Sequence, residues 1–330
     1  MPSEAEVQRE QLAQYIAENS SQAGFAYVNA IGVGVPNDNP AAPEEIVVFH
    51  EPVAACELQD AMAKIAKKAG AVHVEFAPAE RFVGLQAEAG GSVGVDAPSR
   101  YNVPPDNAST LGAVITVTPG GRTFLLGCNH GLAFNGRALG EAVTYPGPLD
   151  QKQPYQIGRV AAYVELKTAA WPVGPAGAGS APNPVDCALA EIGALPVSAP
   201  VTVDALRGNV KLRTQVRKKG RTTGYTIGTV RIKVLGGVVD LSFGTFRFDG
   251  YVGVVSDPPF AVPGDSGGLV VVDPQTGASL SGIGLVTART FCSAGPYKGY
   301  VVAICRLDQA LDALAPQIGV PPGQMAVRSL

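Results

Sequence analysis

The chain has 330 residues, 46% of them hydrophobic and 16% charged, which is enough to bury a large core and to form two or more domains. A formal net charge of −3 gives no electrostatic reason to expect nucleic acid or an anionic membrane as a partner. No apolar run approaches the roughly 20 residues that a membrane-spanning helix needs.

The N-terminal residues and the number of cysteines indicate the compartment in which the protein works. The first ten residues are polar and acidic, unlike a secretory signal, so we expect a cytoplasmic protein. Five cysteines, an odd number spread along the chain, do not form a disulfide framework and are expected to be mostly reduced. Whether Cys292 and Cys305 form a disulfide stays open, because those two can meet across neighbouring strands.

Residues 1–78 are predicted to form a small α+β domain. The expected elements are a helix over about 3–20, strands over 25–35 and 45–50, a helix over 56–68 and a strand over 71–76. His50 and His73 lie here, far in sequence from the motifs described below. We interpret both as structural or surface histidines.

Residues 79–110 change character, because glycine, proline and asparagine interrupt any periodicity. This stretch is predicted to be a linker, or an extended strap that lies over the next domain.

From residue 111 onward the pattern is that of short strands, and periodicity alone supports only an all-β region. Strands are predicted over 113–117, 123–128, 156–166, 186–192, 221–234, 238–248, 251–256, 268–272, 281–287 and 299–304. Residues 167–185, rich in glycine, alanine and proline, are expected to form a long loop. Leu307, Leu311 and Leu314 predict a closing amphipathic helix.

One motif within this region indicates chemistry: Pro-Gly-Asp-Ser-Gly-Gly at residues 263–268, directly before an apolar strand. A serine between an acid and two glycines is typical of a nucleophile on a tight turn. Gly264 and Gly267 permit backbone dihedrals that a side chain disfavours. The N–H groups of Gly264 and Ser266 can then point together at a developing negative charge, as an oxyanion hole does.

A serine nucleophile needs a base, and the base needs an orienting acid. His130 follows an apolar strand and stands in an Asn-His pair, which makes it the candidate base. Asp186, in Asp-Cys-Ala-Leu, is the candidate acid. The order His130, Asp186, Ser266, separated by 56 and 80 residues, is that of chymotrypsin and differs from that of subtilisin and the α/β-hydrolases.

These segments carry a family resemblance. The Gly-Asp-Ser-Gly-Gly motif resembles the nucleophile motif of trypsin-like (chymotrypsin-fold) serine peptidases, and the segments around His130 and Asp186 resemble those of bacterial members. The stretch Lys-Gly-Arg-Thr-Thr-Gly at 219–224, with the strand after it, resembles bacterial trypsin-like peptidases that carry an N-terminal α+β domain. The plant Narrow Leaf type of protease is a more distant resemblance.

The resemblance implies a mainly β chain: a two-barrel chymotrypsin/trypsin-like fold preceded by the small α+β domain. The first barrel would span 111–200 and carry His130 and Asp186, and the second would span 201–330 and carry Ser266. The implied function is a serine endopeptidase that hydrolyses a protein or peptide substrate through a His-Asp-Ser triad and an acyl-enzyme, with no cofactor and no metal.

By family position, Phe260 would form the base of the primary substrate pocket. Thr287, Ala288 and Arg289 would line its wall and pair with the substrate backbone. Without an acid at 260 a preference for Lys or Arg is not supported. A small or apolar side chain is favoured, and Arg289 either narrows the pocket or favours an acid.

The resemblance has one gap, because the chain lacks an activation sequence of the Ile-Val-Gly-Gly kind. In animal zymogens the new N-terminal amine pairs with the Asp that precedes the nucleophile. Asp265 has no such partner evident in the sequence, so we expect a site that is preformed or ordered by something else.

The basic run at 217–221 and the cysteines next to His130 and Asp186 are interpreted as structural features. The basic run 217–221 is interpreted as a solvated hairpin end rather than an anion site. Cys128 and Cys187 are interpreted as small buried hydrophobes, rather than as metal ligands with His130.

Two alternatives to an active peptidase stay open. One is a catalytically quiescent protease-fold protein that serves as a binding or scaffold protein, and the other is a latent signalling protease that cleaves one dedicated partner. The sequence also leaves open the natural substrate and whether the protein forms a homo-oligomer.

Overall fold

Strands dominate the chain, and all eighteen strands in its described part are linked by hydrogen bonds into one continuous array. The computed structural model describes residues 2–36, 42–53, 56–84, 93–96, 107–150, 155–168, 181–193, 201–206, 208, 210–273, 280–321 and 323–329. Much of the predicted strap (85–92 and 97–106) and of the predicted loop beside Asp186 (169–180) lies outside these ranges.

The elements follow one another in this order: α1 (Glu4–Glu18), the 3-10 helix η1 (Ala23–Tyr27), β1 (Val28–Gly34), β2 (Glu45–His50), α2 (Cys56–Ala69), β3 (Val74–Pro78), β4 (Phe82–Gly84), β5 (Gly94–Asp96), β6 (Ala113–Val117), β7 (Thr123–Gly127), α3 (Asn129–Leu132), β8 (Ala142–Tyr145), β9 (Tyr155–Tyr163), β10 (Ala188–Ile192), β11 (Val201–Ala205), β12 (Gln215–Gly220), β13 (Gly224–Leu241), β14 (Gly244–Ser256), β15 (Leu269–Val272), β16 (Leu280–Cys292), β17 (Gly299–Arg306), α4 (Leu307–Leu314), the 3-10 helix η3 (Ala315–Ile318) and β18 (Met325–Ser329).

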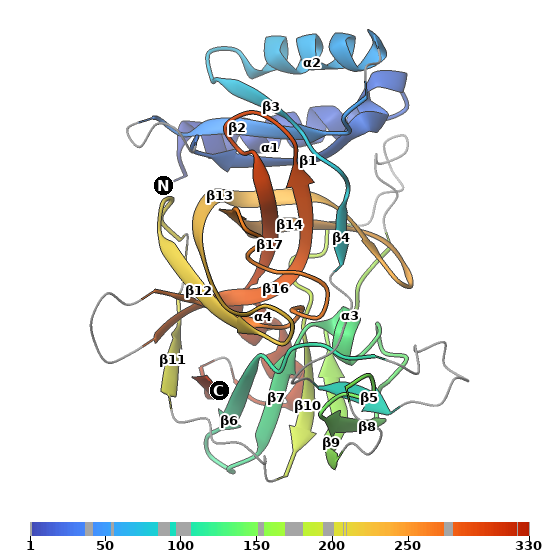
Figure 1. Cartoon of the computed structure of the whole chain (residues 1–330), viewed down its shortest axis with the longest axis vertical. Helices are drawn as coiled ribbons and strands as arrows, with labels where there is room; N and C mark the ends of the chain where they lie inside the picture. The colour runs from blue at the N-terminus through green and yellow to red at the C-terminus, as the bar shows by residue number, and fades with distance from the viewer. Residues whose placement is uncertain are drawn as a thin grey trace.

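The N-terminal region has the predicted order of helix, strand, strand, helix and strand, and Figure 1 shows it at one end of the molecule. Helix α1 begins with a capping box, in which Ser3 and Glu6 each accept from the other's backbone N–H. The two helices pack on the β1–β2–β3 sheet through a buried apolar cluster that includes Leu12, Phe25 and Ile65. Both helices therefore form where the 3.6-residue periodicity predicts them.

This region is joined directly to the following domain. Strand β1 pairs antiparallel with β13, with Ala30 opposite Gly237 and Gly34 opposite Ile232. Ion pairs reinforce the contact: the Arg9 guanidinium lies 2.5 Å from a carboxylate oxygen of Asp249. The N-terminal sheet is thus continuous with the second barrel.

The second barrel closes on itself. Its strands pair in the ring β12–β13–β14–β17–β16–β15 and back to β12. An apolar core fills the ring. Its members are small or branched apolar side chains plus one aromatic ring, and they include Val216, Val230, Val254, Phe260, Val270, Val286 and Ile304. Branched side chains of this kind suit a pleated surface that is buried on its inner face.

The first barrel uses β6, β7, β10, β9, β8 and β5, each paired with the next. A bridge between Val93 and Ser109 brings the two ends of this series together. Strands β11 and β18 connect the barrels, because β11 pairs with β16 and with β18, and β18 pairs with β6. The predicted fold class, mainly β with two barrels after a small α+β region, is confirmed.

One hairpin in the second barrel differs from the prediction. Strands were predicted over 221–234, 238–248 and 251–256, whereas β13 and β14 form one long hairpin that turns after Leu241. The prediction was wrong because the true turn carries Ser242 and Phe243, which are weak turn signals. The glycine pair at 236–237 and the Asp-Gly pair at 249–250 look like turns but lie inside strands, where register shifts absorb them.

None of the helices in the described ranges combines the length and the apolar character that a membrane crossing requires.

Candidate active site

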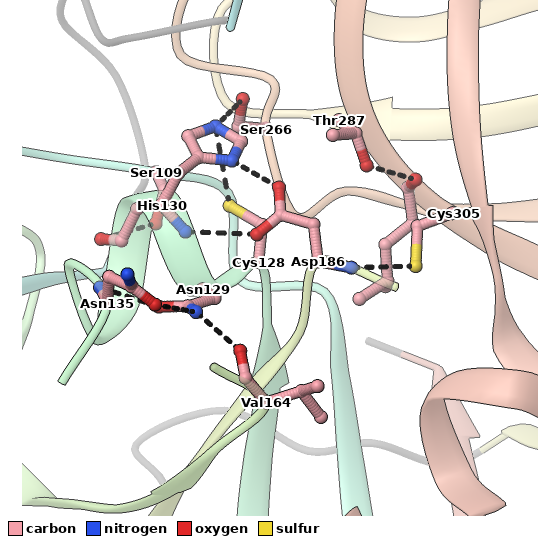
Figure 2. A network of polar contacts seen from close by, with 12 residues as sticks. Ser109, Cys128, Asn129, His130, Asn135, Val164, Asp186, Ser266, Thr287 and Cys305 are labelled. Carbon is pink, nitrogen blue, oxygen red and sulfur yellow. Dashed lines mark hydrogen bonds and ion pairs between the residues drawn. The ribbon is translucent and has the colours of Figure 1, made fainter. Parts of the chain in front are cut away.

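His130 is presented by the short helix α3, which follows β7 of the first barrel. The side chain of Asn129 holds this turn: its amide nitrogen donates to Val164 O at 2.7 Å, and its oxygen accepts from the Asn135 N–H at 2.8 Å. Figure 2 shows these contacts below the imidazole. Asn129, the first residue of the Asn-His pair noted in the sequence, therefore stabilises the turn that carries His130.

Asp186 lies two residues before β10, and the pairing of β10 with β7 places it beside His130 (Ala188 lies opposite Gly127). One carboxylate oxygen, Oδ2, lies 2.5 Å from His130 Nδ1, and Oδ1 accepts from the His130 backbone N–H at 3.1 Å. The Asp186 N–H donates to the Cys305 sulfur at 3.3 Å. Asp186 is thus held from one side and holds the imidazole from the other (Figure 2).

Ser266 lies in the turn before β15, and its Oγ is 2.8 Å from His130 Nε2. The turn is tight, because Gly264 and Gly267 have φ angles of +98° and +84°, in the left-handed region that favours glycine. The Gly267 N–H donates to Val286 O at 2.9 Å, which fixes the turn against β16. The structure therefore brings His130, Asp186 and Ser266 into one hydrogen-bonded chain across the two barrels. The assignment of the Gly264 and Ser266 N–H groups to an oxyanion hole stays a prediction.

The three side chains are sealed from solvent: His130 and Asp186 are fully buried, and Ser266 is 1% exposed. Burial by itself lowers the pKa of His130, but the neighbouring Cys128 sulfur and the Asp186 carboxylate outweigh it. Together they raise the pKa of His130 well above its ordinary value of 6.5. Asp186 therefore stabilises the protonated form of His130.

Asp265, which precedes Ser266, has a partner inside the chain. The Lys218 ammonium lies 3.2 Å from Asp265 Oδ2, and both side chains are fully buried. Asp265 also accepts from the Thr222 and Thr223 N–H groups at 2.9 and 3.2 Å. The Lys218 ammonium lies 5.6 Å from the centroid of the Phe260 ring, a cation–π contact. Lys218 thus neutralises the acid beside Ser266.

Thr110 braces the same turn from the first barrel. Its N–H donates to Ser266 O at 2.8 Å, and its hydroxyl donates to Gly264 O at 2.8 Å. That hydroxyl also accepts from the Arg221 N–H at 2.9 Å. One threonine therefore connects the segment before β6, the nucleophile turn and the end of β12.

The interpretation of residues 217–221 as a solvated hairpin end was wrong for Lys218 and Arg221, although the segment does end the β12–β13 hairpin and Lys219 is exposed. Lys218 and Arg221 are 1% and 8% exposed, and the Arg221 guanidinium forms an ion pair with Asp150. A signal for this was present, because Val216, Lys218 and Gly220 alternate along β12 and all three face the buried side. The five residues form a single basic run in the sequence, but the strand divides them between a buried and an exposed face.

The residues expected to form the substrate pocket are placed as follows. Phe260 is fully buried in the core of the second barrel, and its carbonyl accepts from the Thr226 hydroxyl at 2.7 Å. Thr287 and Ala288 are fully buried on β16, and the Arg289 guanidinium lies 5.4 Å from the Tyr300 ring centroid. At Ala288 and Arg289 the edge of β16 is paired with β4.

All five cysteines are free thiols. Cys292 and Cys305 lie on paired strands but not opposite each other, since Cys292 faces Gly299 and Cys305 faces Leu285. Cys128 and Cys187 are fully buried, as predicted, and the Cys128 sulfur lies 3.7 Å from His130 Nε2.

No protein-family model and no curated protein matches the chain. Among solved structures, protease A of Thermobifida fusca has 17% identity and a TM-score of 0.37, covering 62% of this chain and 88% of its own. A Nocardiopsis protease has 16% identity and a TM-score of 0.38, covering 62% and 89%. The chymotrypsin of Cellulomonas bogoriensis has 18% identity and a TM-score of 0.34, covering 66% and 96%. The fold assignment rests on the strand pairings described above.

Proposed function

We propose that the chain is a serine endopeptidase in which Ser266 is the nucleophile, His130 the general base and Asp186 the orienting acid. The observation that carries the proposal is the hydrogen-bonded chain from Asp186 Oδ2 through His130 to Ser266 Oγ, with separations of 2.5 and 2.8 Å. A nucleophile in contact with a base, and a base in contact with an acid, is the arrangement that activates a serine hydroxyl.

In the proposed acylation step Ser266 Oγ forms a bond to the substrate carbonyl carbon and its proton moves to His130 Nε2. The carbonyl oxygen takes up the electron pair as an oxyanion, which the N–H groups of Gly264 and Ser266 are assigned to bind. The tetrahedral adduct collapses when the C–N bond breaks and Nε2 protonates the leaving amine. Water then repeats the sequence on the ester, releasing the acid and regenerating Ser266.

The neighbours of the triad support these roles. The Asp186 carboxylate lies at Nδ1, so Nδ1 carries the proton and Nε2 is left to accept from Ser266. The buried Lys218–Asp265 pair supports a nucleophile turn that is ordered without proteolytic activation.

One observation favours the latent form of this function over a constitutively active one. Ser266 is 1% exposed and both of its partners are fully buried, so Oγ offers almost no surface to a substrate carbonyl in this structure. We therefore propose a peptidase that is latent at rest.

The test is intact-mass spectrometry after incubation with a fluorophosphonate probe, which phosphonylates an activated serine. We expect one adduct on the wild type, formed slowly because the site is closed. Ser266→Ala should give no adduct, since the attacking oxygen is gone, and His130→Ala should reduce the rate by a factor on the order of 10⁴ or more.

Each variant must first show a wild-type unfolding transition, so that loss of labelling is not loss of fold. An adduct of equal yield on Ser266→Ala would place the reactive group elsewhere. No adduct on the folded wild type after prolonged incubation, including at alkaline pH, would contradict the peptidase function and leave a protease-fold binding protein.

A further inference from the structure

Strand β4 pairs with the edge of β16 beside the candidate site. Gly84 lies opposite Ala288 and Val83 opposite Arg289, in antiparallel register. The pairing continues upstream, where Ala79 forms a bridge with Cys292. In Figure 1 β4 descends from the N-terminal region along the second barrel. Residues 78–84 therefore run as a strand along the edge 293–288, and we refer to them as the β4 strap.

The direction of the strap is set by where the nucleophile lies along β16. Val286, which precedes Ala288 by two residues on β16, accepts from the Gly267 N–H at 2.9 Å and donates to Gly268 O at 3.0 Å. The end of β16 that Gly84 reaches is thus the end nearest Ser266. The strap runs from its N-terminal to its C-terminal end toward the nucleophile.

A peptide that acylates Ser266 must run in the same direction. Its reacting carbonyl belongs to the residue at the C-terminal end of the segment that lies on the enzyme, so an extended segment antiparallel to β16 presents that carbonyl to the serine. Extended peptides bind sheet edges through the free backbone N–H and C=O groups of the edge strand. At Ala288 and Arg289 those groups face β4 instead.

We propose that the β4 strap is a built-in competitor that occupies the backbone edge needed by the peptide substrate and keeps the site closed until it is released. This inference rests on the proposed peptidase function and explains how the latency arises. The edge is occupied by the chain's own segment, in the orientation of a substrate, while His130, Asp186 and Ser266 are already hydrogen-bonded to one another.

Defined contacts hold the strap in place. The Phe82 side chain is 2% exposed and packs edge-to-face on Phe49, with 6.2 Å between ring centroids. Backbone pairing of Phe82 with Val239 ties it to β13 on the other side. Closer to the edge, the Thr290 hydroxyl donates to Glu80 O at 2.6 Å. The Thr290 contact can be removed without opening the core, because valine fills the same volume.

The first experiment compares the wild type with Thr290→Val. The readout is the rate of Ser266 modification by two probes, a fluorophosphonate without a peptide arm and a diphenyl phosphonate carrying a tri-alanyl arm, which needs the β16 edge. Loss of the hydroxyl bond to Glu80 O weakens the strap, so the rate with the armed probe should rise about fivefold, the factor expected for one hydrogen bond. The ratio of the armed to the armless rate should also rise.

Thr214→Val is the matched control. Its hydroxyl donates to Lys211 O at 2.7 Å, the same kind of bond at a place far from the strap along the chain. Both rates should equal those of the wild type in this variant.

The second experiment locks the strap. Ala79→Cys places a thiol opposite the native Cys292 across the antiparallel bridge, where the Cβ atoms are close enough for a disulfide. After oxidation, verified by intact mass, the armed probe should react at least about tenfold more slowly than after reduction of the same sample. The wild type under the same oxidant and reductant corrects for direct effects on its own thiols.

The outcomes separate the two proposals. If the armless probe labels Ser266 but neither Thr290→Val nor the locked strap changes the armed rate, the strap is only structural and its role as a competitor is wrong. If neither probe labels Ser266 in any folded variant, the peptidase function fails, and the competitor role fails with it.

Discussion

At the scale of single residues, the candidate site depends on how His130 is charged. The Asp186 carboxylate and the Cys128 sulfur, both in contact with the imidazole, outweigh the effect of burial and raise its pKa. A raised pKa means that the protonated imidazole persists to higher pH than in an exposed histidine. An imidazolium has no free electron pair at Nε2 and cannot accept the Ser266 proton.

This predicts the pH dependence of Ser266 phosphonylation. The rate should fall as the pH falls through the pKa of His130, with a midpoint above 6.5. Asp186→Asn should move the midpoint to lower pH, because the carboxylate that opposes the effect of burial on the His130 pKa is then gone. The substitution should also lower the maximal rate on the order of 10⁴-fold. The measurement is a pH–rate profile from intact mass.

Glu191→Gln serves as the control. Glu191 lies on β10, the strand that follows Asp186, and it is exposed and forms an ion pair with Arg122. A wild-type midpoint at or below 6.5 would contradict the charge assignment. The same pKa has a consequence for stability: the stabilisation from protonated His130 is fully present below about 6.5 and is lost as the pH rises through the raised pKa.

At the scale of elements, β12 and the nucleophile turn form one unit through Lys218 and Asp265. Alternation along β12 puts Lys218 on the inner face of the barrel, where burial lowers its pKa and the contact with Asp265 partly restores it. Gly220 on the same face is required by packing, because a Cβ there would lie 2.2 Å from Asp265 Oδ1. The strand thus provides both the counter-charge and the space for the acid.

Lys218→Met is predicted to destabilise the protein by about 3 kcal/mol and to slow Ser266 phosphonylation. Asp265 would be left as a buried charge without its cation, although the N–H groups of Thr222 and Thr223 would remain. Urea unfolding gives the first quantity and labelling kinetics the second. The double variant Lys218→Met with Asp265→Asn should recover part of the lost stability.

Lys219→Met is the matched control, because Lys219 is exposed on the outer face of the same strand. It should change the free energy of unfolding by less than about 0.5 kcal/mol. Equal effects of the two substitutions would mean that the buried ion pair does not order the turn.

At the scale of the whole molecule, the N-terminal region is held on the second barrel by backbone pairing and by ion pairs. Strand β1 extends the sheet at β13, and Arg9 of α1 reaches Asp249 of β14. Lys233 of β13 lies 3.0 Å from Glu6 and 2.8 Å from Glu44. Because the β4 strap begins at Pro78, the last residue of β3, the position of this region also sets the position of the strap.

Arg9→Ala should loosen this attachment. Arg9 is 2% exposed and contacts Asp249 through two nitrogens, so its removal should lower the free energy of unfolding by about 2–3 kcal/mol. Hydrogen exchange of the α1 and β1 amides should accelerate. Arg81→Ala, which removes an exposed ion pair with Glu51, should cost less than about 1 kcal/mol. Equal costs of the two substitutions would contradict the role of Arg9 in attaching the N-terminal region to the second barrel.

The sequence alone predicted the parts of this protein whose signals are local. Ser266 is marked by its own glycine turn, His130 by the strand and asparagine before it, and the N-terminal helices by their periodicity. Local chain geometry determines each of these, so neighbouring residues carry enough information. The chain order of the triad then indicated which three residues meet.

Only the tertiary structure decided which distant segments share a neighbour. That Lys218 pairs with Asp265, that Thr110 braces Ser266 and that β4 pairs with the edge of β16 depends on strand register across long separations in the chain. Register is set by the packing of whole faces, so no short pattern around Lys218 or β4 reveals its partner. The sequence therefore indicated that His130, Asp186 and Ser266 lie together, whereas their burial and the pairing of β4 beside them follow from the fold.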